Sequence, residues 1–379
     1  MVLVMPRPDA KRNILLLLGA GASKDAGLPL AVEITDRIVE DIERTYPLLL
    51  PLLRFVHGGI CFGRGCSNKR PDEKVNIEEF LIACQDLATR SSSSLYPFVA
   101  SWHERLTEVG RLPDEIGDPN VTNAFEFVAR HCKKRLREWL TLNDITMAKY
   151  FRNLKDFITS GFRLHVFSLN YDECVELALE HELGEINGKW TTGFAHKGWK
   201  PDLLENKRKR FDALLYKLHG SLDWVEDEEL GVCSLKWPMA ERAEEIPDTY
   251  DSLLIFATAM KVIPRDPYLT LLIRFRTELF RCECVVILGY SFGDEHVNTM
   301  LLDALRKRPT LQCVIANRKA DVAEYLPRTF REEIARDRFH NVFEEKDGVK
   351  LGVMLALEKD VLLRKVKEVC QRPVEAMPF

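Results

Sequence analysis

Long apolar runs are missing from this sequence. Uninterrupted stretches such as Ile14–Leu18 are far shorter than the roughly 20 apolar residues that a membrane-spanning helix needs. The N-terminal segment contains Pro6 and Pro8, and no small-residue cleavage site follows a long apolar stretch, so we read no secretory signal in it. We therefore expect a cytoplasmic protein without membrane contact.

Paired cysteine knuckles are also missing, although the chain contains 10 cysteines. A structural zinc site usually shows CxxC pairs or Cys/His clusters. Here Cys61 and Cys66 are separated by four residues in an expected polar loop, and Cys282 and Cys284 flank Glu283. Free thiols in a reducing cytosol are the favoured interpretation, so no metal is expected. A zinc ion held by Cys61, Cys66 and distant partners is the alternative.

An excess of charge of one sign is the third missing feature. The formal net charge of the 379 residues is −4, which gives no electrostatic case for a nucleic-acid or anionic-membrane partner. The basic run at 207–210 is too short to change this, and we expect no direct nucleic-acid binding. The length permits two or three domains, and a single α/β unit with an inserted module fits equally well.

The first pattern that is present is a strand, a glycine loop and a helix. Residues 13–18 form a nearly continuous apolar run, typical of a strand buried on both faces of a parallel sheet. Gly19, Gly21 and Gly27 punctuate the following loop, and Pro29 suits the first turn of a helix. Apolar residues then recur every four positions along one face of that helix.

Strands and helices alternate in the later part of the chain, which predicts an α/β fold with a doubly wound, Rossmann-like parallel sheet. We expect strands at 164–169, 189–194, 213–218, 253–256, 284–288 and 311–316, and helices at 172–181, 268–281 and 294–307. Before them the pattern indicates helices at 76–90, 95–109, 122–142 and 145–160, with exposed loops at 57–74 and 111–120. The expected domains are an α/β domain (10–45 and 160–335), an inserted helical module (46–159) and a C-terminal extension (336–379).

The glycine loop has the composition of a nucleotide-binding turn. Gly19-Ala20-Gly21-Ala22-Ser23 follows the first strand, at the place where open α/β sheets bind nucleotides. Its glycines allow a pyrophosphate to approach the backbone at the start of a helix, and Ser23 adds a hydroxyl. The dinucleotide pattern is incomplete because position 24 is Lys, so a purely structural turn is the alternative.

Two later strand exits carry polar side chains. Asp172 in the motif LNYD is explained as a helix cap, whereas Asn170 has a donor and an acceptor for an amide, a ribose hydroxyl or a water. His219 follows another strand in the motif LHGS and can serve as a general base, with a structural histidine as the alternative. In a doubly wound sheet these exits can face one crevice.

The fourth exit is the segment GYSFGDEHVN at residues 289–298. Gly289 and Ser291 can approach a ribose or an adenine closely, and Asp294 suits the N-cap of the next helix. His296 is explained equally well by local hydrogen bonding as by a role as a second base. We interpret this segment as binding rather than catalytic.

In this order, GAGAS, FSLNYD, KLHGS and GYSFGDEHVN resemble the motif set of sirtuin-like proteins, and more closely that of the bacterial sirtuin-like NAD hydrolases of antiphage defence systems. The resemblance covers residues 10–45 and 160–320 and leaves out the helical module. It implies that NAD binds across the sheet edge as the substrate. The pyrophosphate would lie on the loop formed by Gly19, Ala20, Gly21 and Ser23.

The resemblance also implies a role for single residues. Asn170 would lie beside the nicotinamide ribose and orient the attacking group, and His219 would act as the base on the ribose hydroxyls. Asp172 would help to bind the nicotinamide side or hold the loop. Gly289, Ser291 and the neighbouring backbone at Phe292 would hold the adenosine half.

Two departures from the deacylating sirtuins decide the expected activity. Those enzymes carry Asp-Phe-Arg shortly after the glycine loop and a four-cysteine zinc ribbon. This chain continues with GLPLAVE at 27–33 and shows no cysteine knuckles after His219. Water is therefore favoured over an acetyl-lysine oxygen as the nucleophile, which gives hydrolysis of NAD to ADP-ribose and nicotinamide. NAD-dependent deacylation or ADP-ribosyl transfer, and a non-catalytic sensor of NAD or ADP-ribose, are the alternatives.

Control of such an activity is expected to lie in assembly. An enzyme that destroys NAD must be held inactive until a signal arrives, and the sequence shows no separate sensor domain. We expect a homo-oligomer or a separately encoded partner, for which the resemblance suggests a HerA-type ATPase or a helicase-like protein. The helical module and the apolar residues between Val342 and Val369 are candidate contact surfaces, and for the second the alternative is that these residues complete the core.

Overall fold

The chain folds into two units. The computed structural model describes residues 11–67, 74–90, 103–118, 121–142, 144–185, 189–195, 198–205, 211–229, 231–235, 266–317, 326–342, 345–346, 349–350 and 352–371. One unit comprises the described residues up to Leu28 and from Thr141 onward, and the other is Pro29–Leu140. These bounds differ from the expected module at 46–159, because the helix after the glycine loop belongs to the second unit and residues 141–159 belong to the first.

The first unit is built on a seven-stranded sheet in which every described strand pair is parallel. The strand order is β11-β10-β9-β1-β2-β6-β3. The strands are β1 (Arg12–Leu18), β2 (Phe162–Ser168), β3 (Trp190–Thr191), β6 (Ala213–Lys217), β9 (Cys284–Leu288), β10 (Gln312–Ala316) and β11 (Phe339–Asn341). The chain places β2, β3 and β6 on one side of β1 and then returns beside β1 to place β9, β10 and β11 on the other side. The expected doubly wound α/β fold is confirmed.

The side chains of β1 alternate between two cores. Ile14, Leu16 and Leu18 join the core on one face of the sheet, and Leu15 and Leu17 join the core on the other. Burial on both faces explains the continuous apolar run of this strand. The helices that cover the first face are α7 (Leu154–Thr159), α8 (Cys174–Glu185), α13 (Val353–Glu358) and α14 (Val361–Gln371).

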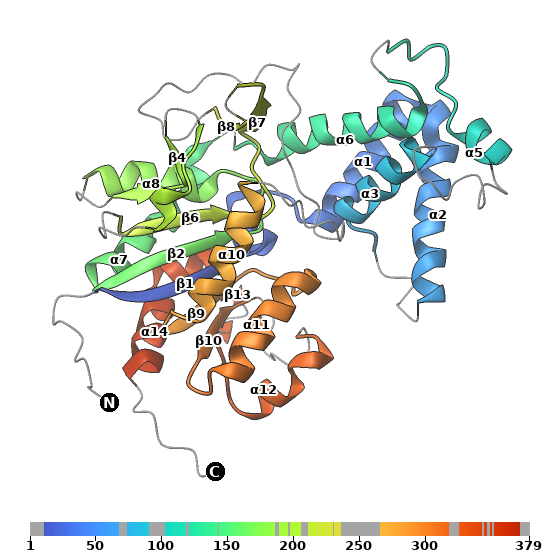
Figure 1. Cartoon of the computed structure of the whole chain (residues 1–379). Coiled ribbons are helices and arrows are strands. Elements are labelled where there is room, and N and C mark those ends of the chain that lie inside the picture. Colours follow the sequence, from blue (N-terminus) through green and yellow to red (C-terminus); the bar gives the residue numbers. More distant parts are fainter. Residues whose placement is uncertain are drawn as a thin grey trace. The chain divides into compact units, whose positions relative to one another are not determined.

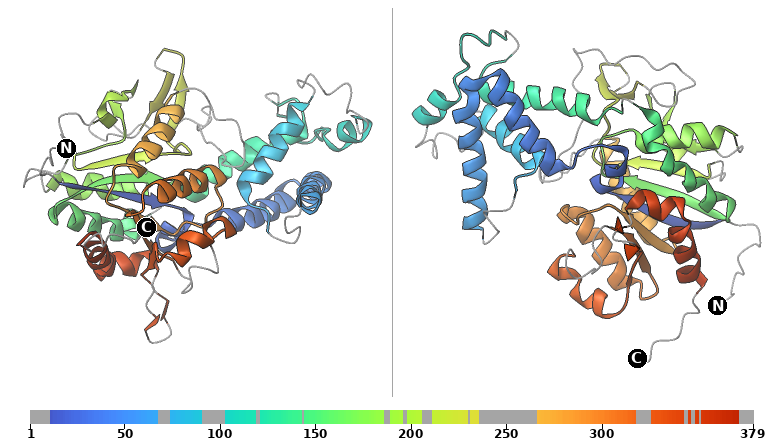
Figure 2. Two further views of the ribbon diagram at one scale, coloured as in Figure 1. Left: turned by 60° about the horizontal axis from the view of Figure 1, so that its bottom comes forward. Right: turned by 180° about the vertical axis from the view of Figure 1, so that it is seen from behind.

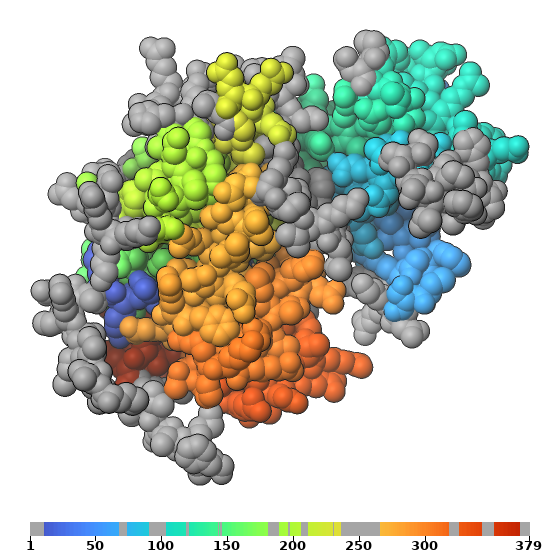
Figure 3. All heavy atoms as spheres, in the orientation of Figure 1, coloured from blue at the N-terminus to red at the C-terminus, as the bar shows by residue number. Residues whose placement is uncertain are grey.

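The opposite face is covered by α10 (Tyr268–Leu279), α11 (Glu295–Lys307) and α12 (Arg331–Ala335). Figures 1 and 2 show helices on both sides of the sheet. In Figure 3, the side chains of α10 and α11 (orange) lie side by side over this face. No helix among the described residues is long and apolar enough to cross a membrane.

The C-terminal helices belong to the core of the first unit. Val353 and Leu357 of α13 and Val366 of α14 are buried there. The start of α13 is also tied to the region after the glycine loop, because the carboxylate of Asp25 accepts the backbone N–H of Met354 at 3.0 Å. These apolar residues therefore complete the core.

Smaller elements surround the main sheet. They are a four-stranded sheet of β4 (Phe194–Ala195), β5 (Gly198–Trp199), β8 (Gly231–Ser234) and β7 (Trp224–Asp227), the pair β12 (Glu345–Lys346) and β13 (Val349–Lys350), and the short helix α9 (Asp202–Glu205). The single strand expected at 189–194 is therefore wrong, because Gly193, with φ +88, separates β3 of the main sheet from β4 of the small one. The strand expected at 253–256 lies outside the described residues.

The second unit is helical. Its helices are α1 (Ala31–Thr45), α2 (Leu50–Cys66), α3 (Ile77–Ala88), α5 (His103–Val109) and α6 (Ala124–Leu140). Ile34, Ile38 and Ile42 form the buried stripe of α1, as their spacing predicts. The helices expected at 76–90 and 122–142 are confirmed with slightly shorter bounds. Of the helix expected at 95–109, residues 95–102 lie outside the described residues.

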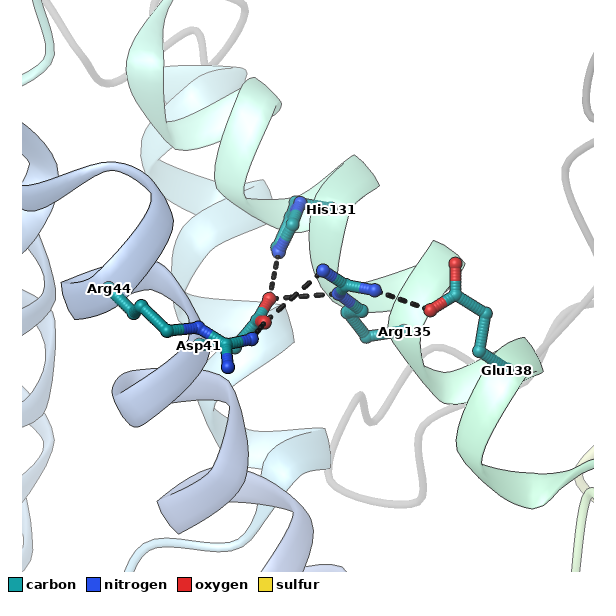
Figure 4. Close-up of polar contacts among 5 residues, drawn as sticks. All are labelled: Asp41, Arg44, His131, Arg135 and Glu138. Atoms are coloured by element: carbon teal, nitrogen blue, oxygen red, sulfur yellow. Dashed lines mark hydrogen bonds and ion pairs between the residues drawn. The ribbon is translucent and has the colours of Figure 1, made fainter.

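A buried carboxylate joins two helices of this unit. Asp41 of α1 accepts hydrogen bonds from His131 Nε2 at 2.7 Å and from Arg135 Nε at 2.8 Å, both on α6. Arg44, one turn further along α1, adds a bond to the same carboxylate at 3.1 Å. Figure 4 shows these side chains converging on Asp41, with Glu138 beside Arg135. The bonds from His131 and Arg135 hold α1 against α6.

The loop expected at 57–74 is wrong in its first part, because residues 57–66 continue α2. The first half of α2 is anchored by the buried residues Leu52, Leu53 and Val56. Its second half is exposed and rich in glycine, which removes the apolar periodicity on which the sequence interpretation depended. Residues 145–160 were expected to be one α-helix but form the 3₁₀ segment η5 (Ile145–Asn153) followed by α7.

Candidate active site

The glycine loop lies against the loop that follows β9. Gly21 donates its N–H to the carbonyl oxygen of Gly289 at 2.9 Å. A Cβ atom on Gly19 would stand 2.6 Å from Cα of Tyr290, and one on Gly289, where φ is +57, would stand 2.1 Å from the nitrogen of Ala22. Side chains do not tolerate such distances, so the contact between the two loops requires glycine at these positions.

An α-helix does not follow the glycine loop directly, which corrects the expectation. The loop forms two 3₁₀ turns, η1 (Ala20–Ala22) and η2 (Lys24–Ala26), and α1 begins only at Ala31 in the other unit. Gly27 ends the second turn in a left-handed conformation with φ +84. Within the loop, the N–H of Ala22 donates to Gly19 at 2.8 Å and the N–H of Ser23 donates to Ala20 at 3.2 Å. A phosphate at this loop would therefore meet the exposed turn at Ala20 rather than an α-helix N-terminus.

Asn170 ties the exit of β2 to the glycine loop. Its Nδ2 donates to the carbonyl oxygen of Gly19 at 3.0 Å and to the hydroxyl of Ser23 at 3.1 Å. Its backbone N–H donates to the hydroxyl of Ser168 at 3.1 Å. The amide nitrogen is therefore occupied, and among the described residues no hydrogen bond to Oδ1 is found. The oxygen of Asn170 is the atom available to a ligand.

His219 is paired with an aspartate from the fourth exit. The turn at the end of β6, closed by Gly220 with φ +84, presents the ring. His219 Nε2 lies 3.0 Å from Oδ2 of Asp294. The other oxygen of that carboxylate accepts the N–H groups of His296 and Val297 at 2.8 and 3.0 Å, which caps α11. Asp294 is therefore a helix cap, as expected, and also the partner of His219.

The charge of Asp294 is maintained despite its burial. Burial alone raises the pKa of this carboxyl, but the hydrogen bond and charge of His219 and the two backbone N–H donors outweigh it, and the pKa lies below its ordinary value. An ionised carboxylate only accepts hydrogen bonds, so Nε2 of His219 is the protonated nitrogen. When the ring is neutral, Nδ1 then carries the lone pair that can take up a proton.

A polar clamp holds the loop between β9 and α11. The hydroxyl of Tyr290 donates to Oδ1 of Asn298 at 2.9 Å, and Nδ2 of Asn298 donates to the carbonyl oxygen of Phe292 at 2.8 Å. Phe292 has φ +60, an uncommon conformation for a residue with a large side chain. The clamp stabilises this conformation and so fixes the position from which Asp294 reaches His219.

The four strand exits are linked in a closed circuit. The glycine loop contacts the β9 exit, and the β9 exit contacts the β6 exit through Asp294 and His219. The β6 exit is bonded to the β2 exit through the N–H of Leu222 and the carbonyl of Tyr171 at 3.2 Å. Asn170 then returns to the glycine loop. This circuit lies at the carboxyl edge of the sheet beside β1 and β9, where the strand order reverses and open α/β sheets bind ligands.

The expected site residues differ in exposure. Ala20 and Ser291 are exposed, and Gly21 and Gly289 are partly buried. The side chains of Ser23, Asn170, Asp172, His219 and Phe292 are buried. Asp172 accepts the N–H of Cys174, the first residue of α8, at 3.1 Å, which is the capping role expected from the sequence. The buried polar groups thus lie behind a more exposed backbone surface.

Sequence reasoning missed a buried lysine at this edge. Lys217, the last residue of β6, donates to the carbonyl oxygen of Asp172 and pairs with Oε1 of Glu176 at 3.0 Å. Its signal was a lysine at the end of an otherwise apolar strand, two positions before His219. A charged residue there is unusual because such strands are buried on both faces.

Some of the cysteines are close neighbours, such as Cys284 and Cys370, whose thiols are joined by a hydrogen bond. All 10 are free thiols, and most of them are buried. No group of three or more His, Cys, Asp or Glu side chains that suits a metal ion occurs in the part of the chain that the structure describes. Cys61 and Cys66 lie on α2 and not in a loop. At five positions apart they are separated by about 140° around the helix, which does not suit ligands of one ion.

Part of the sequence is similar to a known protein family. Residues 164–342 match the sequence model described as the SIR2-like domain. The match covers less than half of the chain. The match begins in β2 and ends just after β11, and it includes three of the four strand exits. The glycine loop lies outside the match and follows β1, which pairs with β2 and β9 of the matched segment. No curated protein matches the sequence.

Solved Sir2 structures are similar to the whole chain at a low level. A Sir2 homologue in complex with 2′-O-acetyl ADP-ribose is 12% identical, with 96% of each chain covered and a TM-score of 0.42. A Sir2 homologue in complex with NAD is 14% identical over 94% of this chain and 91% of that chain, with a TM-score of 0.41. Sir2 bound to an acetylated peptide is 12% identical over 94% of each chain, with a TM-score of 0.38. The similarity to the SIR2-like domain is therefore a similarity of sequence over residues 164–342.

Proposed function

We propose that this protein is an NAD glycohydrolase, which cleaves the bond between nicotinamide and ribose to give ADP-ribose and nicotinamide. The observation that carries the proposal is the circuit of strand exits in a SIR2-like domain, which brings Asn170, His219 and Asp294 to one edge of the sheet. These residues supply an amide oxygen and a carboxylate-bound imidazole, and both suit the ribose side of NAD.

The backbone around this circuit would bind the substrate. The pyrophosphate of NAD would lie at the turn containing Ala20 and Gly21, and the adenosine half would lie against the loop at Gly289, Ser291 and Phe292. Ala20 and Ser291 are the exposed members. The contact between the two glycine-containing loops fixes both binding segments in one place. Ser23 would act indirectly, because its side chain is buried and its hydroxyl oxygen accepts a hydrogen bond from Asn170.

The leaving group needs no protonation by the enzyme. The pyridinium ring of NAD is already cationic, so nicotinamide leaves as a neutral molecule that keeps the electron pair of the broken C–N bond. The ribose carbon then carries oxocarbenium character and is attacked by the oxygen of a water. Asn170 orients this water through Oδ1, and His219 accepts its proton at Nδ1 while Asp294 stabilises the resulting imidazolium.

Incubation of the purified protein with NAD tests the proposal directly. We expect nicotinamide and ADP-ribose in equal amounts by chromatography, with no need for an acetylated peptide. Asn170→Ala should lower the rate by about two decades or more. Nicotinamide release that depends strictly on an acetylated peptide or another protein acceptor would instead show a transferase. Binding of NAD without turnover would show a sensor.

We further propose that the activity is restrained by assembly and serves antiphage defence. An unregulated NAD hydrolase would exhaust the NAD of its own cell, so the free chain must be inactive or held in a complex. The candidates are a homo-oligomer and a separately encoded ATPase or helicase-like protein. Light scattering after size-exclusion chromatography, with and without the genomic neighbours, tests this. A strictly monomeric chain with full NAD cleavage would contradict it.

A further inference from the structure

A buried lysine connects the two exits that carry the proposed catalytic residues. The side chain of Lys217 is only 1% exposed. Its Nζ bonds to the carbonyl oxygen of Asp172 on the β2 exit and to the carboxylate of Glu176 on α8. Asp172 follows Asn170 by two residues, and Lys217 precedes His219 by two residues. One ammonium group therefore lies between the segments that carry Asn170 and His219.

Folding does not require a charge at this position. The four preceding residues of β6 (213–216) are apolar or aromatic and fully buried, and an apolar side chain at 217 would continue the pattern. A buried ion pair is often no more stabilising than apolar groups of the same volume. Other buried polar groups at this edge also cost free energy of folding. Oε2 of Glu176, the hydroxyl of Ser221 and Oδ1 of Asp223 have no hydrogen-bond partner among the described residues.

The contacts of Lys217 have a geometric consequence at the edge of the sheet. Backbone bonds already join the two exits, from the N–H of Leu218 to Ser168 at 2.9 Å and from the N–H of Leu222 to Tyr171 at 3.2 Å. Between these two bonds, the segment after β2 and the segment after β6 both leave the sheet. The bond from Lys217 to Asp172 is the side-chain link that crosses this gap, and Glu176 holds the ammonium in place.

We propose that Lys217 is a positioning residue, which fixes the loop that carries Asn170 relative to the turn that carries His219. Glu176 acts through Lys217 by orienting its ammonium group. This inference rests on the proposed function for its effect on catalysis, but its geometric part can be tested without any activity. It predicts that loss of the ammonium misplaces two catalytic groups and leaves the nucleotide-binding backbone at Ala20 and Ser291 intact.

The test variant removes the ammonium group together with the carboxylate that faces it. Lys217→Met keeps the length of the side chain and removes the donor, and Glu176→Gln in the same protein removes the facing carboxylate. We expect kcat for NAD cleavage to fall at least about ten-fold. KM and the affinity for ADP-ribose should change by less than about three-fold, because the binding backbone is separate from the link. If Lys217→Met alone does not fold, the double variant still provides the measurement.

Arg338→Met is the matched control. Arg338 is also a buried cation, which donates to the backbone carbonyl of Leu311 at 2.6 Å and lies beside the buried carboxylate of Glu333. It precedes β11 at the opposite edge of the sheet from the site. A loss of kcat that this variant shares would show a general effect of removing a buried charge and would overturn the proposal.

Hydrogen exchange gives the second readout. In the double variant, the amides of Leu218, Leu222 and Cys174 should exchange at least about ten-fold faster than in the wild type. The control variant should leave these amides unchanged. If the wild type does not cleave NAD, the proposed function fails, and the exchange measurement still decides whether Lys217 joins the two exits. Unchanged exchange in the double variant would refute the positioning role.

Discussion

Each unit of the molecule contains a buried His–Asp pair, and the two pairs have similar geometry. His219 Nε2 lies 3.0 Å from Asp294 in the α/β unit, and His131 Nε2 lies 2.7 Å from Asp41 in the helical unit. Both aspartates are less than 10% exposed, and both have a pKa below its ordinary value. Distance and burial alone therefore do not separate a catalytic pair from a structural one.

The surroundings of the two aspartates differ. Asp41 also accepts hydrogen bonds from the guanidinium groups of Arg135 and Arg44, so cations other than the histidine neutralise its charge (Figure 4). Asp294 binds two backbone N–H groups with its second oxygen, and its remaining strong partner is His219. A carboxylate that is not shared with arginine stabilises the charged form of its histidine more strongly. The pair at the strand exit is therefore suited to proton transfer.

The histidines themselves provide the largest expected contrast. His219→Ala should lower NAD cleavage by about two decades or more, because the base on the attacking water is lost. His131→Ala removes a histidine with the same kind of partner and should leave the rate of the folded protein unchanged. Steady-state rates of nicotinamide release, with circular dichroism as a check of folding, give the comparison. Equal losses in both variants would remove the distinction between the pairs.

Substitution of Asp294 should mainly lower activity, and substitution of Asp41 should mainly lower stability. Asp294→Asn keeps an oxygen that can cap α11 but removes the charge beside His219, so we expect a loss of at least about ten-fold in kcat. Asp41→Asn should instead lower the free energy of unfolding by about 2 kcal/mol, because Arg135 and His131 lose a charged acceptor. Chemical denaturation and rate measurements on both variants test this.

Arg44→Ala is the control for the second of these variants. Its side chain is 80% exposed, so its ion pair with Asp41 contributes little to stability. A loss of stability in Arg44→Ala as large as that in Asp41→Asn would show that the buried acceptor at Asp41 is not the source of the effect.

Glu176 supplies a pH dependence of the opposite sign to that of the two aspartates. Burial raises the pKa of Glu176 from 4.5 to about 7, against the attraction of Lys217. The folded state thus holds a proton that the unfolded state has released, so this contribution to stability is fully present below pH 4.5 and is lost as the pH rises to about 7. For Asp41, whose pKa is lowered from 3.8, stability is lost as the pH falls below that value.

The measurement is the difference in unfolding free energy between wild type and Glu176→Gln across this pH range. We expect the wild type to lose stability relative to the variant as the pH rises. A difference that stays constant with pH would show that Glu176 is ionised in the folded protein throughout. The Asp41→Asn variant shows whether the denaturation data resolve a titration of the usual sign.

Much of the fold could be predicted from local pattern. The apolar run at 13–18 indicates a strand, because burial on both faces of a sheet requires apolar residues. The polar residues after the strands indicate a site, because open α/β sheets bind ligands at the strand ends. The order of the strand exits and the capping role of Asp294 follow from the same kind of pattern.

The pairings across the sheet edge could not be predicted from one sequence. The bond of Asp294 to His219 and that of Lys217 to Asp172 span 75 and 45 positions, and nothing local to either residue specifies the partner. The prediction for the glycine-rich half of α2 was wrong for another reason. This half is exposed, so its sequence has no apolar periodicity that would indicate a helix. The two 3₁₀ turns after β1 depend on the contact of Gly21 with Gly289, which is also distant in the sequence.

The smallest expected effect is that of a chelator on either unit. Zinc held by Cys61 and Cys66 was the one metal site that the sequence left open, and their positions on a single helix place their side chains about 140° apart. Cys61 does have a nitrogen near it, His57 Nδ1 at 3.7 Å, but these two groups are exposed or half-exposed on one turn of α2 and supply only two of the four ligands that structural zinc takes. We therefore expect EDTA to leave both the melting temperature and the rate of NAD cleavage unchanged. The proposed reaction agrees with this, because a cationic leaving group needs no Lewis acid.

Elemental analysis of the purified protein is the more decisive measurement, since a tightly bound ion can resist EDTA. A stoichiometric zinc signal that disappears in Cys61→Ser would show that α2 binds a metal together with ligands from elsewhere in the chain or from a second copy.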